Sequence, residues 1–171
     1  MNAKKLFIYS IIMIFIPATR LFGFKRFLLR WCGASIGSNV RIVSSAKFNI
    51  TGPLTIGDDT WIGHDVLLVG GNAPITIGAR CDIAPRVTLV SGTHKINTSG
   101  DRVAGDGYSL PIKLGDGNWI CTSAVILGGT VIQNYCLVAS GAIVKDSFPS
   151  KCMISGIPAK NRKNDIFLDA N

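Results

Sequence analysis

The sequence is short of several residue types, and each shortage excludes a class of protein. It contains no glutamate, only 16% of its residues are charged, and 47% are hydrophobic, which is too apolar for intrinsic disorder. It has two histidines, His64 and His94, and five cysteines without a Cys-x-x-Cys pair. This set supports neither a metal site nor a disulfide framework. It favours a reducing compartment, and we expect a cytoplasmic protein.

Acidic residues are absent from the N-terminal third of the chain. The first is Asp58, whereas residues 1–57 contain eight lysines and arginines, so the whole formal net charge of +8 belongs to this segment. The remaining residues are neutral overall, and the chain has no motif that reads bases. We therefore expect no nucleic acid partner. The length of 171 residues is that of one domain.

No apolar run is long enough to cross a bilayer comfortably, which takes about 20 residues. Residues 6–16 are apolar and end at Pro17, and residues 21–31 alternate large apolar residues with Arg and Lys at helical spacing. We expect residues 1–31 to form a basic, apolar helical segment. It either lies peripherally on the inner face of the cytoplasmic membrane or packs on a neighbouring subunit.

An aliphatic or aromatic residue recurs at every sixth position, and irregular steps fall only after every third member. A period of six has no helical phase, but it suits a solenoid with three six-residue sides per coil. A small residue four positions later predicts a narrow triangular core, and the Gly that often follows the aliphatic residue predicts corners with unusual backbone angles. The five triplets are Ile36, Ile42, Phe48; Ile56, Ile62, Leu68; Ile77, Ile83, Leu89; Leu114, Ile120, Ile126; and Ile132, Val138, Val144.

These triplets predict an all-β fold, a parallel β-helix of about five coils over residues 32–163, with residues 164–171 as a tail. The repeated motif, as in IGDDTW, IGHDVL, IGARCD and IAPRVT, resembles that of the hexapeptide-repeat acyltransferases over residues 33–163. The resemblance implies a left-handed helix and a homotrimer with active sites between subunits. It also implies acetyl-CoA as co-substrate, without a metal.

One long insertion interrupts the repeat. After Leu89 the period places the next coil near residue 95, but the series resumes at Leu114. The residues between are polar and glycine-rich, so we expect residues 95–113 to form a protruding functional loop with His94 at its root. The order of His94, the loop, Pro111-Ile112-Lys113-Leu114-Gly115-Asp116 and Trp119-Ile120 is similar to the sugar and xenobiotic O-acetyltransferase branch, which includes maltose and galactoside acetyltransferases.

The resemblance implies a role for several side chains. His94 would take the proton from the acceptor hydroxyl as general base. Acceptor-binding candidates are His64, Asp65 and Trp119, although related enzymes often carry asparagines where this chain has Gly63-His64-Asp65. From the residues alone, alternatives stay open: an exposed loop residue for His94, a solvated corner residue for His64 and a corner tryptophan for Trp119. Positions similar to the family's coenzyme-binding residues are Ala139, Ser140, Gly141, Lys145, Lys160 and Arg162, the last two in and after the sequence Ser-Gly-Ile-Pro-Ala-Lys.

The function implied by the resemblance is acetyl-CoA-dependent O-acetylation of a carbohydrate hydroxyl. The basic, apolar N-terminal segment favours a membrane-associated acceptor, such as an intermediate of capsule, O-antigen or exopolysaccharide biosynthesis. Two alternatives stay open. One is acetylation of a small diffusible sugar, an amino sugar or an antibiotic, and the other is a non-catalytic solenoid scaffold.

Overall fold

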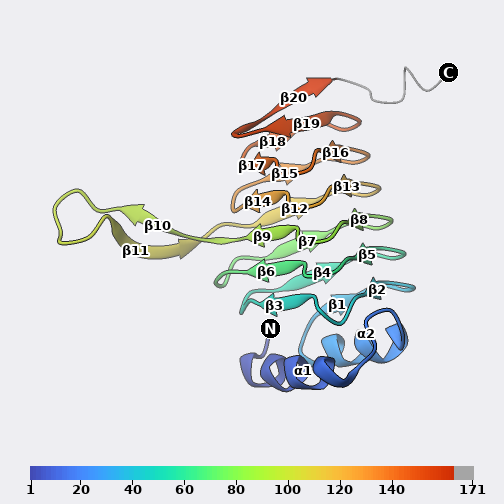
Figure 1. Cartoon of the computed structure of the whole chain (residues 1–171). Coiled ribbons are helices and arrows are strands. Elements are labelled where there is room, and N and C mark those ends of the chain that lie inside the picture. Colours follow the sequence, from blue (N-terminus) through green and yellow to red (C-terminus); the bar gives the residue numbers. More distant parts are fainter. Residues whose placement is uncertain (164–171) are drawn as a thin grey trace.

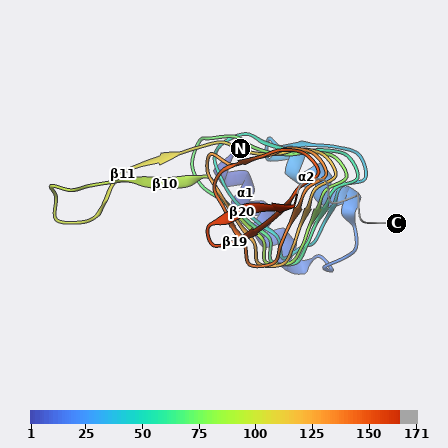
Figure 2. The same ribbon diagram turned by 90° about the horizontal axis from the view of Figure 1, so that it is seen from above.

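A computed structural model describes residues 1–163, which form a three-sided parallel β-helix with two helices at its N-terminal end (Figure 1). The residues predicted to form a tail, 164–171, lie outside the described part of the chain. Helix α1 (Ala3–Phe15) and helix α2 (Phe22–Trp31) lie beneath the first coil. Seen along its axis, the β-helix has a roughly triangular section (Figure 2). Each side of the triangle is one parallel sheet, named A, B and C here in chain order.

The three sheets stack equivalent strands of successive coils. Sheet A contains β1 (Ser35–Ile36), β4 (Leu54–Ile56), β7 (Ile75–Ile77), β12 (Ile112–Leu114), β15 (Val131–Ile132) and β18 (Ser147–Phe148). Sheet B contains β2 (Arg41–Ile42), β5 (Trp61–Ile62), β8 (Asp82–Ile83), β13 (Trp119–Ile120), β16 (Leu137–Val138), β19 (Met153–Gly156) and the antiparallel β20 (Ala159–Lys163). Sheet C contains β3 (Lys47–Asn49), β6 (Leu67–Val69), β9 (Thr88–Val90), β14 (Val125–Leu127) and β17 (Ile143–Val144).

The predicted fold, an all-β left-handed parallel β-helix with helices at its N-terminus, is confirmed. The five complete coils are those that the aliphatic triplets predict, and β18 and β19 add two sides of a sixth. The period of six does not extend to this last coil because only Lys145 and Asp146 separate β17 from β18. Phe148 therefore follows Val144 by four positions and still stacks on Ile132.

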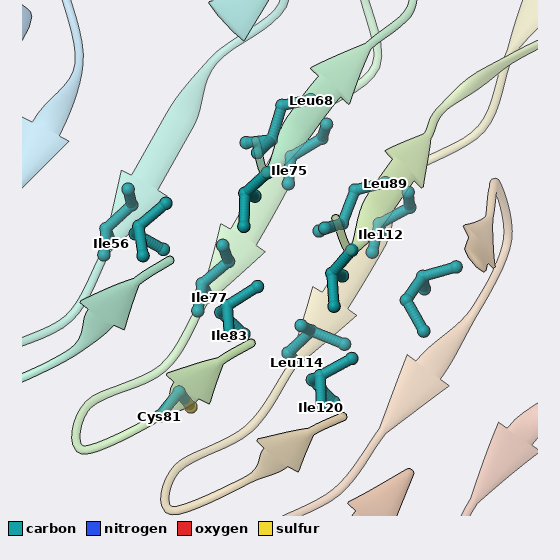
Figure 3. Packing of buried hydrophobic residues seen from close by; sticks show 14 of the residues in the cluster. Ile56, Leu68, Ile75, Ile77, Cys81, Ile83, Leu89, Ile112, Leu114 and Ile120 are labelled. Carbon is teal, nitrogen blue, oxygen red and sulfur yellow. The ribbon is translucent and has the colours of Figure 1, made fainter. Parts of the chain in front are cut away.

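The repeated aliphatic residues form the core, and each stacks in register on its equivalent in the next coil (Figure 3). In sheet A, Ile56 pairs with Ile77, and Ile77 pairs with Leu114 across the long insertion. The insertion therefore leaves the stacking of the coils unchanged. Complete burial of each such side chain contributes about 1.5–3 kcal/mol, which makes the ladder the main source of stability.

The glycines that follow the aliphatic residues are explained by crowding, and the prediction of unusual backbone angles there is wrong. A Cβ atom on Gly57 would lie 2.5 Å from the Ala79 nitrogen, and one on Gly78 would lie 2.5 Å from the Gly115 carbonyl carbon. The left-handed residue of these corners comes two positions later, as at Asp59 (φ 56°) and Arg80 (φ 53°). Glycine is thus needed where one coil passes directly over the next.

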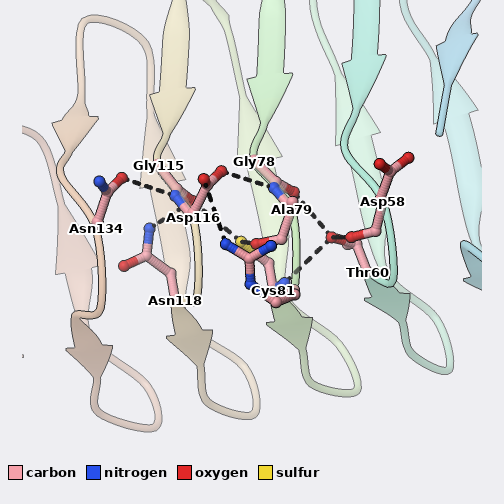
Figure 4. A network of polar contacts seen from close by, with 10 residues as sticks. Asp58, Thr60, Gly78, Ala79, Cys81, Gly115, Asp116, Asn118 and Asn134 are labelled. Carbon is pink, nitrogen blue, oxygen red and sulfur yellow. Dashed lines mark hydrogen bonds and ion pairs between the residues drawn. The ribbon is translucent and has the colours of Figure 1, made fainter. Parts of the chain in front are cut away.

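Polar side chains along the corner between sheets A and B tie each coil to the following one (Figure 4). The buried Asn118 accepts from the Cys136 N–H at 2.7 Å and donates to the Gly115 carbonyl at 2.9 Å. Asp116 accepts from the Ala79 N–H, and its own N–H donates to Asn134, both at 2.9 Å. These bonds satisfy backbone groups that the tight corner turns away from the sheets.

Replacing Asn118 with alanine should lower the free energy of unfolding by about 2 kcal/mol, because it leaves the buried Cys136 N–H without a partner and the Gly115 carbonyl with only the weak Cys81 thiol donor. The measurement is urea denaturation followed by circular dichroism. Asn134→Ala serves as the matched control, since Asn134 is exposed and water can replace its bond to the Asp116 N–H. Equal losses in both variants would contradict the role given to the buried amide.

The N-terminal helices close the open end of the core. Leu6, Tyr9 and Met13 of α1 are buried, and the Tyr9 ring meets Phe48 edge-on with 5.9 Å between ring centroids. Lys25 of α2 is also buried, and its ammonium group donates to the carbonyls of Pro17, Ala18 and Ile42 at 2.7–3.1 Å. Burial lowers the pKa of Lys25. Neither helix of the described residues has the length and apolar character needed to cross a membrane.

Candidate active site

The long insertion folds as a β-hairpin that projects sideways from the third coil (Figure 1). Its strands are β10 (Gly92–Ile96) and β11 (Ala104–Ser109). The root is fixed by two hydrogen bonds, from the Leu110 N–H to the Ser91 carbonyl at 2.9 Å and from the Ala73 N–H to the Ser109 hydroxyl at 3.0 Å. The hairpin therefore projects from a rigid base.

His94 lies on this hairpin near its root, with an exposed side chain. Its Nδ1 is 2.8 Å from the carbonyl oxygen of Gly105 on the opposite strand. A carbonyl oxygen only accepts hydrogen bonds, so Nδ1 carries a proton, and in the neutral imidazole Nε2 has the free lone pair. The hairpin thus holds the imidazole in the tautomer and orientation that a general base requires.

The three corners of the triangle separate the other predicted site residues. We call the turns from sheet A to B, B to C and C to A the first, second and third corners. His94 lies at the third corner of coil 3, whereas His64 and Asp65 lie at the second corner of coil 2. Trp119 lies on sheet B in coil 4, half-exposed, between Asp82 and Leu137. Within a single subunit, His64, Asp65 and Trp119 therefore do not lie beside His94.

The third corner also carries predicted coenzyme-binding residues. Lys145 lies there in coil 5, two coils from His94, which is about 10 Å at the ~4.8 Å spacing of stacked strands. Strand β20 lies beside β17, and the Lys160 ammonium is 3.6 Å from the carboxylate of Asp146. Lys145 and Lys160 therefore gather at the same end of the corner. Arg162, on the same strand as Lys160, is exposed.

Two residues that the sequence analysis missed, Gly128 and Gly129, occupy the third corner between His94 and Lys145. A Cβ on Gly128 would lie 2.8 Å from the Ser91 carbonyl oxygen at the hairpin root, and Gly129 has φ +90° and is exposed. Apart from the adjacent Leu110 side chain, main chain therefore lines this stretch of the corner. The signal was a pair of adjacent glycines, but the third corner of coil 2 has a similar pair, Gly70-Gly71, so the signal alone did not single out this stretch.

The remaining candidates lie along the second corner. His64 is exposed, and its backbone carbonyl accepts from the Arg86 N–H at 2.8 Å. Ala139, Ser140 and Gly141 form the same corner in coil 5, where Gly141 has φ +69° and open space beside it. Along the β-helix axis, His64 on this corner thus lies one coil from the level of His94 on the third corner. Ala139, Ser140 and Gly141 lie at the level of Lys145 on the third corner.

Residues 1–163 contain no group of three or more His, Cys or Asp side chains that could hold a metal ion. The cysteines are all free. Burial raises the pKa of the Cys81 thiol to about 11, which makes it unreactive as a nucleophile near neutral pH.

No family model matches the chain. The putative colanic acid biosynthesis acetyltransferase WcaF of Escherichia coli is 33% identical over 139 residues, which are 81% of this chain and 74% of that protein. The chain belongs to the hexapeptide-repeat acetyltransferases. It is therefore an enzyme that transfers acetyl groups. The galactoside O-acetyltransferase of Escherichia coli is 28% identical over 78% of this chain and 64% of its own length.

Solved structures of this family have the same fold. A maltose O-acetyltransferase from Clostridium difficile superposes with a TM-score of 0.73, at 20% identity over 95% of this chain and 83% of its own. The hexapeptide-repeat acetyltransferase VCA0836 of Vibrio cholerae, crystallised with acetyl coenzyme A, superposes with a TM-score of 0.72, at 22% identity over 94% of this chain and 85% of its own.

Proposed function

We propose that this chain is an acetyl-CoA-dependent O-acetyltransferase that modifies a carbohydrate hydroxyl in surface polysaccharide biosynthesis. The observation that carries the proposal is the hydrogen bond from His94 Nδ1 to the Gly105 carbonyl, which leaves Nε2 free as a base. The names of WcaF and of the lipopolysaccharide biosynthesis O-acetyl transferase WbbJ support a polysaccharide acceptor of the capsule, O-antigen or exopolysaccharide type.

In the proposed reaction, His94 Nε2 takes the proton of the acceptor hydroxyl while the oxygen attacks the thioester carbonyl. The C–O bond of the new ester forms and the C–S bond breaks. The imidazolium then returns the proton to the departing sulfur, so the products are an acetylated sugar and free coenzyme A. Neutral imidazole is restored, and the reaction needs no metal.

Acetyl-CoA would lie along the third corner. Its thioester would be near His94, its pantetheine arm along Gly128 and Gly129, and its phosphates near Lys145, Lys160 and Arg162. This placement is supported by the stacking of these residues in the required order over about two coils. Solved relatives contain acetyl-CoA or coenzyme A.

The active form would be a homotrimer with shared sites. A three-fold axis parallel to the β-helix keeps equal heights on neighbouring subunits. The second corner of one subunit would then bring His64 and Asp65 near the level of the next subunit's His94, and Ala139, Ser140 and Gly141 to the level of its Lys145. Trp119 on sheet B would face the same interface. The protein would work in the cytoplasm at the inner face of the cytoplasmic membrane.

The test of this function is release of coenzyme A from acetyl-CoA with three kinds of acceptor: a lipid-linked or oligomeric glycan, a free sugar or antibiotic, and an amino sugar. We expect turnover with a lipid-linked or oligomeric glycan, and an alkali-labile ester in the product. Turnover confined to a free sugar or antibiotic would favour the small-molecule alternative. An alkali-stable amide in the product would show that the acceptor is the amine of an amino sugar. Absence of donor turnover with every acceptor would contradict the proposed carbohydrate acceptor.

Lys160→Ala should weaken acetyl-CoA binding about tenfold, because it removes one charge-assisted contact to phosphate. Isothermal titration calorimetry measures the dissociation constant without knowledge of the acceptor. Lys47→Ala, an exposed lysine in coil 1, is the matched control and should bind as the unmodified protein does. Equal affinities in all three proteins would remove Lys160 from the proposed coenzyme site.

A further inference from the structure

The two N-terminal helices expose apolar side chains on the side that faces away from the β-helix. With 3.6 residues per turn, the buried Leu6, Tyr9 and Met13 of α1 lie on one side of that helix. Phe15 lies opposite, and Phe7 and Ile14 lie on one flank of the helix; the three side chains are 79%, 67% and 76% exposed. The full exposed apolar set of both helices is Phe7, Ile8, Ile11, Ile14, Phe15, Phe24, Phe27 and Trp31.

Basic side chains surround these apolar residues. Lys4, Arg20 and Arg30 are exposed, and Arg26 is half-buried. Arg26 donates to the Val40 carbonyl, and Arg30 donates to the Ile36 carbonyl, so both guanidinium groups lie at the edge of this surface next to coil 1 without being neutralised. The two ion pairs of residues 1–163, Arg80–Asp116 and Lys160–Asp146, both lie elsewhere, and no acidic residue precedes Asp58. We call these four basic residues and the exposed apolar set the docking face.

We infer that the docking face binds an anionic lipid bilayer, so that the β-helix stands on the membrane by its N-terminal end. The inference rests on the proposed function, since it specifies how the enzyme would meet a membrane-associated acceptor. Large apolar side chains mixed with unpaired cations are typical of segments that enter the interfacial region of anionic membranes. A second copy meeting this face with its own would place like charges together, which disfavours self-association there.

An apolar groove beside α1 extends the docking face. It has a volume of about 830 Å³, lies between α1 and coil 1, and includes Phe7 and Ile14 in its lining. Such a groove has room for the hydrocarbon chain of a bound lipid. Parallel subunits of a trimer would also present three docking faces in one plane, which increases the strength of attachment.

This orientation fixes the height of the reaction above the membrane. His94 lies two coils above the first coil, and the helices add one more layer, so the imidazole would be about 20 Å from the lipid surface. The hairpin projects sideways at this height (Figure 1). A sugar attached directly to a membrane lipid would lie below His94, and a sugar further along a lipid-linked glycan would reach it.

The experiment is sedimentation with vesicles, of phosphatidylcholine alone or of phosphatidylcholine mixed with phosphatidylglycerol. We expect binding to the anionic vesicles and much weaker binding to the neutral ones. The double variant Phe7→Ser/Ile14→Ser should bind about 100-fold more weakly, because two large apolar side chains no longer transfer to lipid. Lys4→Gln/Arg20→Gln should weaken binding to anionic vesicles about fivefold for each charge removed.

Val103→Ser is the matched control, since Val103 is 72% exposed but lies in the hairpin. It should bind vesicles as the unmodified protein does. Unchanged binding by the Phe7/Ile14 double variant, or equal binding to neutral and anionic vesicles, would overturn the inference. So would a double variant that changes the oligomeric mass in light scattering but retains vesicle binding, since the face would then be a subunit contact.

The vesicle assay contains neither donor nor acceptor, so it separates this inference from the proposed function. A protein that binds vesicles but transfers no acetyl group contradicts the function alone. A protein that acetylates a glycan but ignores vesicles contradicts the docking face alone. The Phe7/Ile14 double variant should retain the unmodified rate with a water-soluble glycan, because neither residue contributes to the proposed site.

Discussion

Replacing His94 with alanine should lower the rate of acetyl transfer at least about 100-fold, the usual contribution of a positioned general base. The acceptor hydroxyl would then lose its proton to water, while every group that holds the donor remains. Acetyl-CoA affinity should therefore stay unchanged in calorimetry. A loss of rate with retained donor binding is the expected signature of a residue that acts in the chemical step.

His64→Ala supplies the matched control, because His64 is the other histidine of the chain and is exposed as well. Its loss should raise the KM for the acceptor and leave kcat within a few-fold of the unmodified value. His94→Gln should be as inactive as His94→Ala, since an amide accepts no proton near neutral pH. A His94→Ala enzyme with near-normal kcat would show that another group is the base.

The Gly105 carbonyl orients the imidazole of the proposed base. It holds the Nδ1 proton of His94 through the pairing of β10 with β11, which has an irregular register between His94 and Ile96. The sequence predicted a functional loop with His94 at its root. It did not predict this bond, because the partner of Nδ1 is a backbone atom whose position depends on how the hairpin pairs.

The β-helix was predictable because each core position repeats in the sequence and each repeat makes the same contact. The two-residue turn at Lys145 and Asp146, which shortens the step from Val144 to Phe148 to four positions, hid the sixth coil. The reason for glycine at positions such as Gly57 was also hidden, since the atom that a Cβ would meet belongs to another coil.

The arrangement of the candidate site was less predictable for the same reason. His94, Gly128 and Lys145 are far apart in sequence and share a corner only once the coils are stacked and the insertion is placed outside them. A sequence motif can identify candidate site residues. That these candidates share one corner follows only from the order of the strands in the three sheets. The separation of His64 and Trp119 from His94 likewise emerged only from the topology.

The stability of the fold should fall steeply above pH 9, because several weak acids are buried in their neutral forms. Burial raises the pKa of Cys81 to about 11, from an ordinary value of 9.0. It also raises the pKa of Cys152, whose sulfur is 3.6 Å from that of Cys136, and the pKa of Tyr9. In the unfolded chain these groups ionise at their ordinary values.

Whether stability rises or falls with pH depends on which state of the chain, folded or unfolded, retains the Cys81 proton. Below pH 9 the Cys81 thiol is protonated in both states, and its contribution is fully present. Between pH 9 and about 11 the unfolded chain loses this proton while the folded chain retains it, so unfolding becomes more favourable by about 1.4 kcal/mol per pH unit. Above pH 11 both states are ionised, and about 3 kcal/mol has been lost.

Lys25 acts in the opposite direction. Burial lowers its pKa, so the folded chain releases this proton at lower pH than the unfolded chain does, and stability rises with pH through that window. One amine opposes Cys81, Cys152 and Tyr9, which leaves a net loss of stability in alkali. Urea denaturation at a series of pH values from 7 to 11, with a reducing agent present, measures the slope.

Cys81→Ala identifies the thiol's share of this slope. The variant starts less stable because a buried side chain is lost, but its stability should fall less steeply between pH 9 and 11, by the ~1.4 kcal/mol per unit that one thiol contributes. Cys121→Ala is the control, since Cys121 is half-buried and should change the slope less. Parallel curves for the Cys81→Ala variant and the unmodified protein would mean that Cys81 ionises alike in both states, and would leave the alkaline instability to Tyr9 and Cys152.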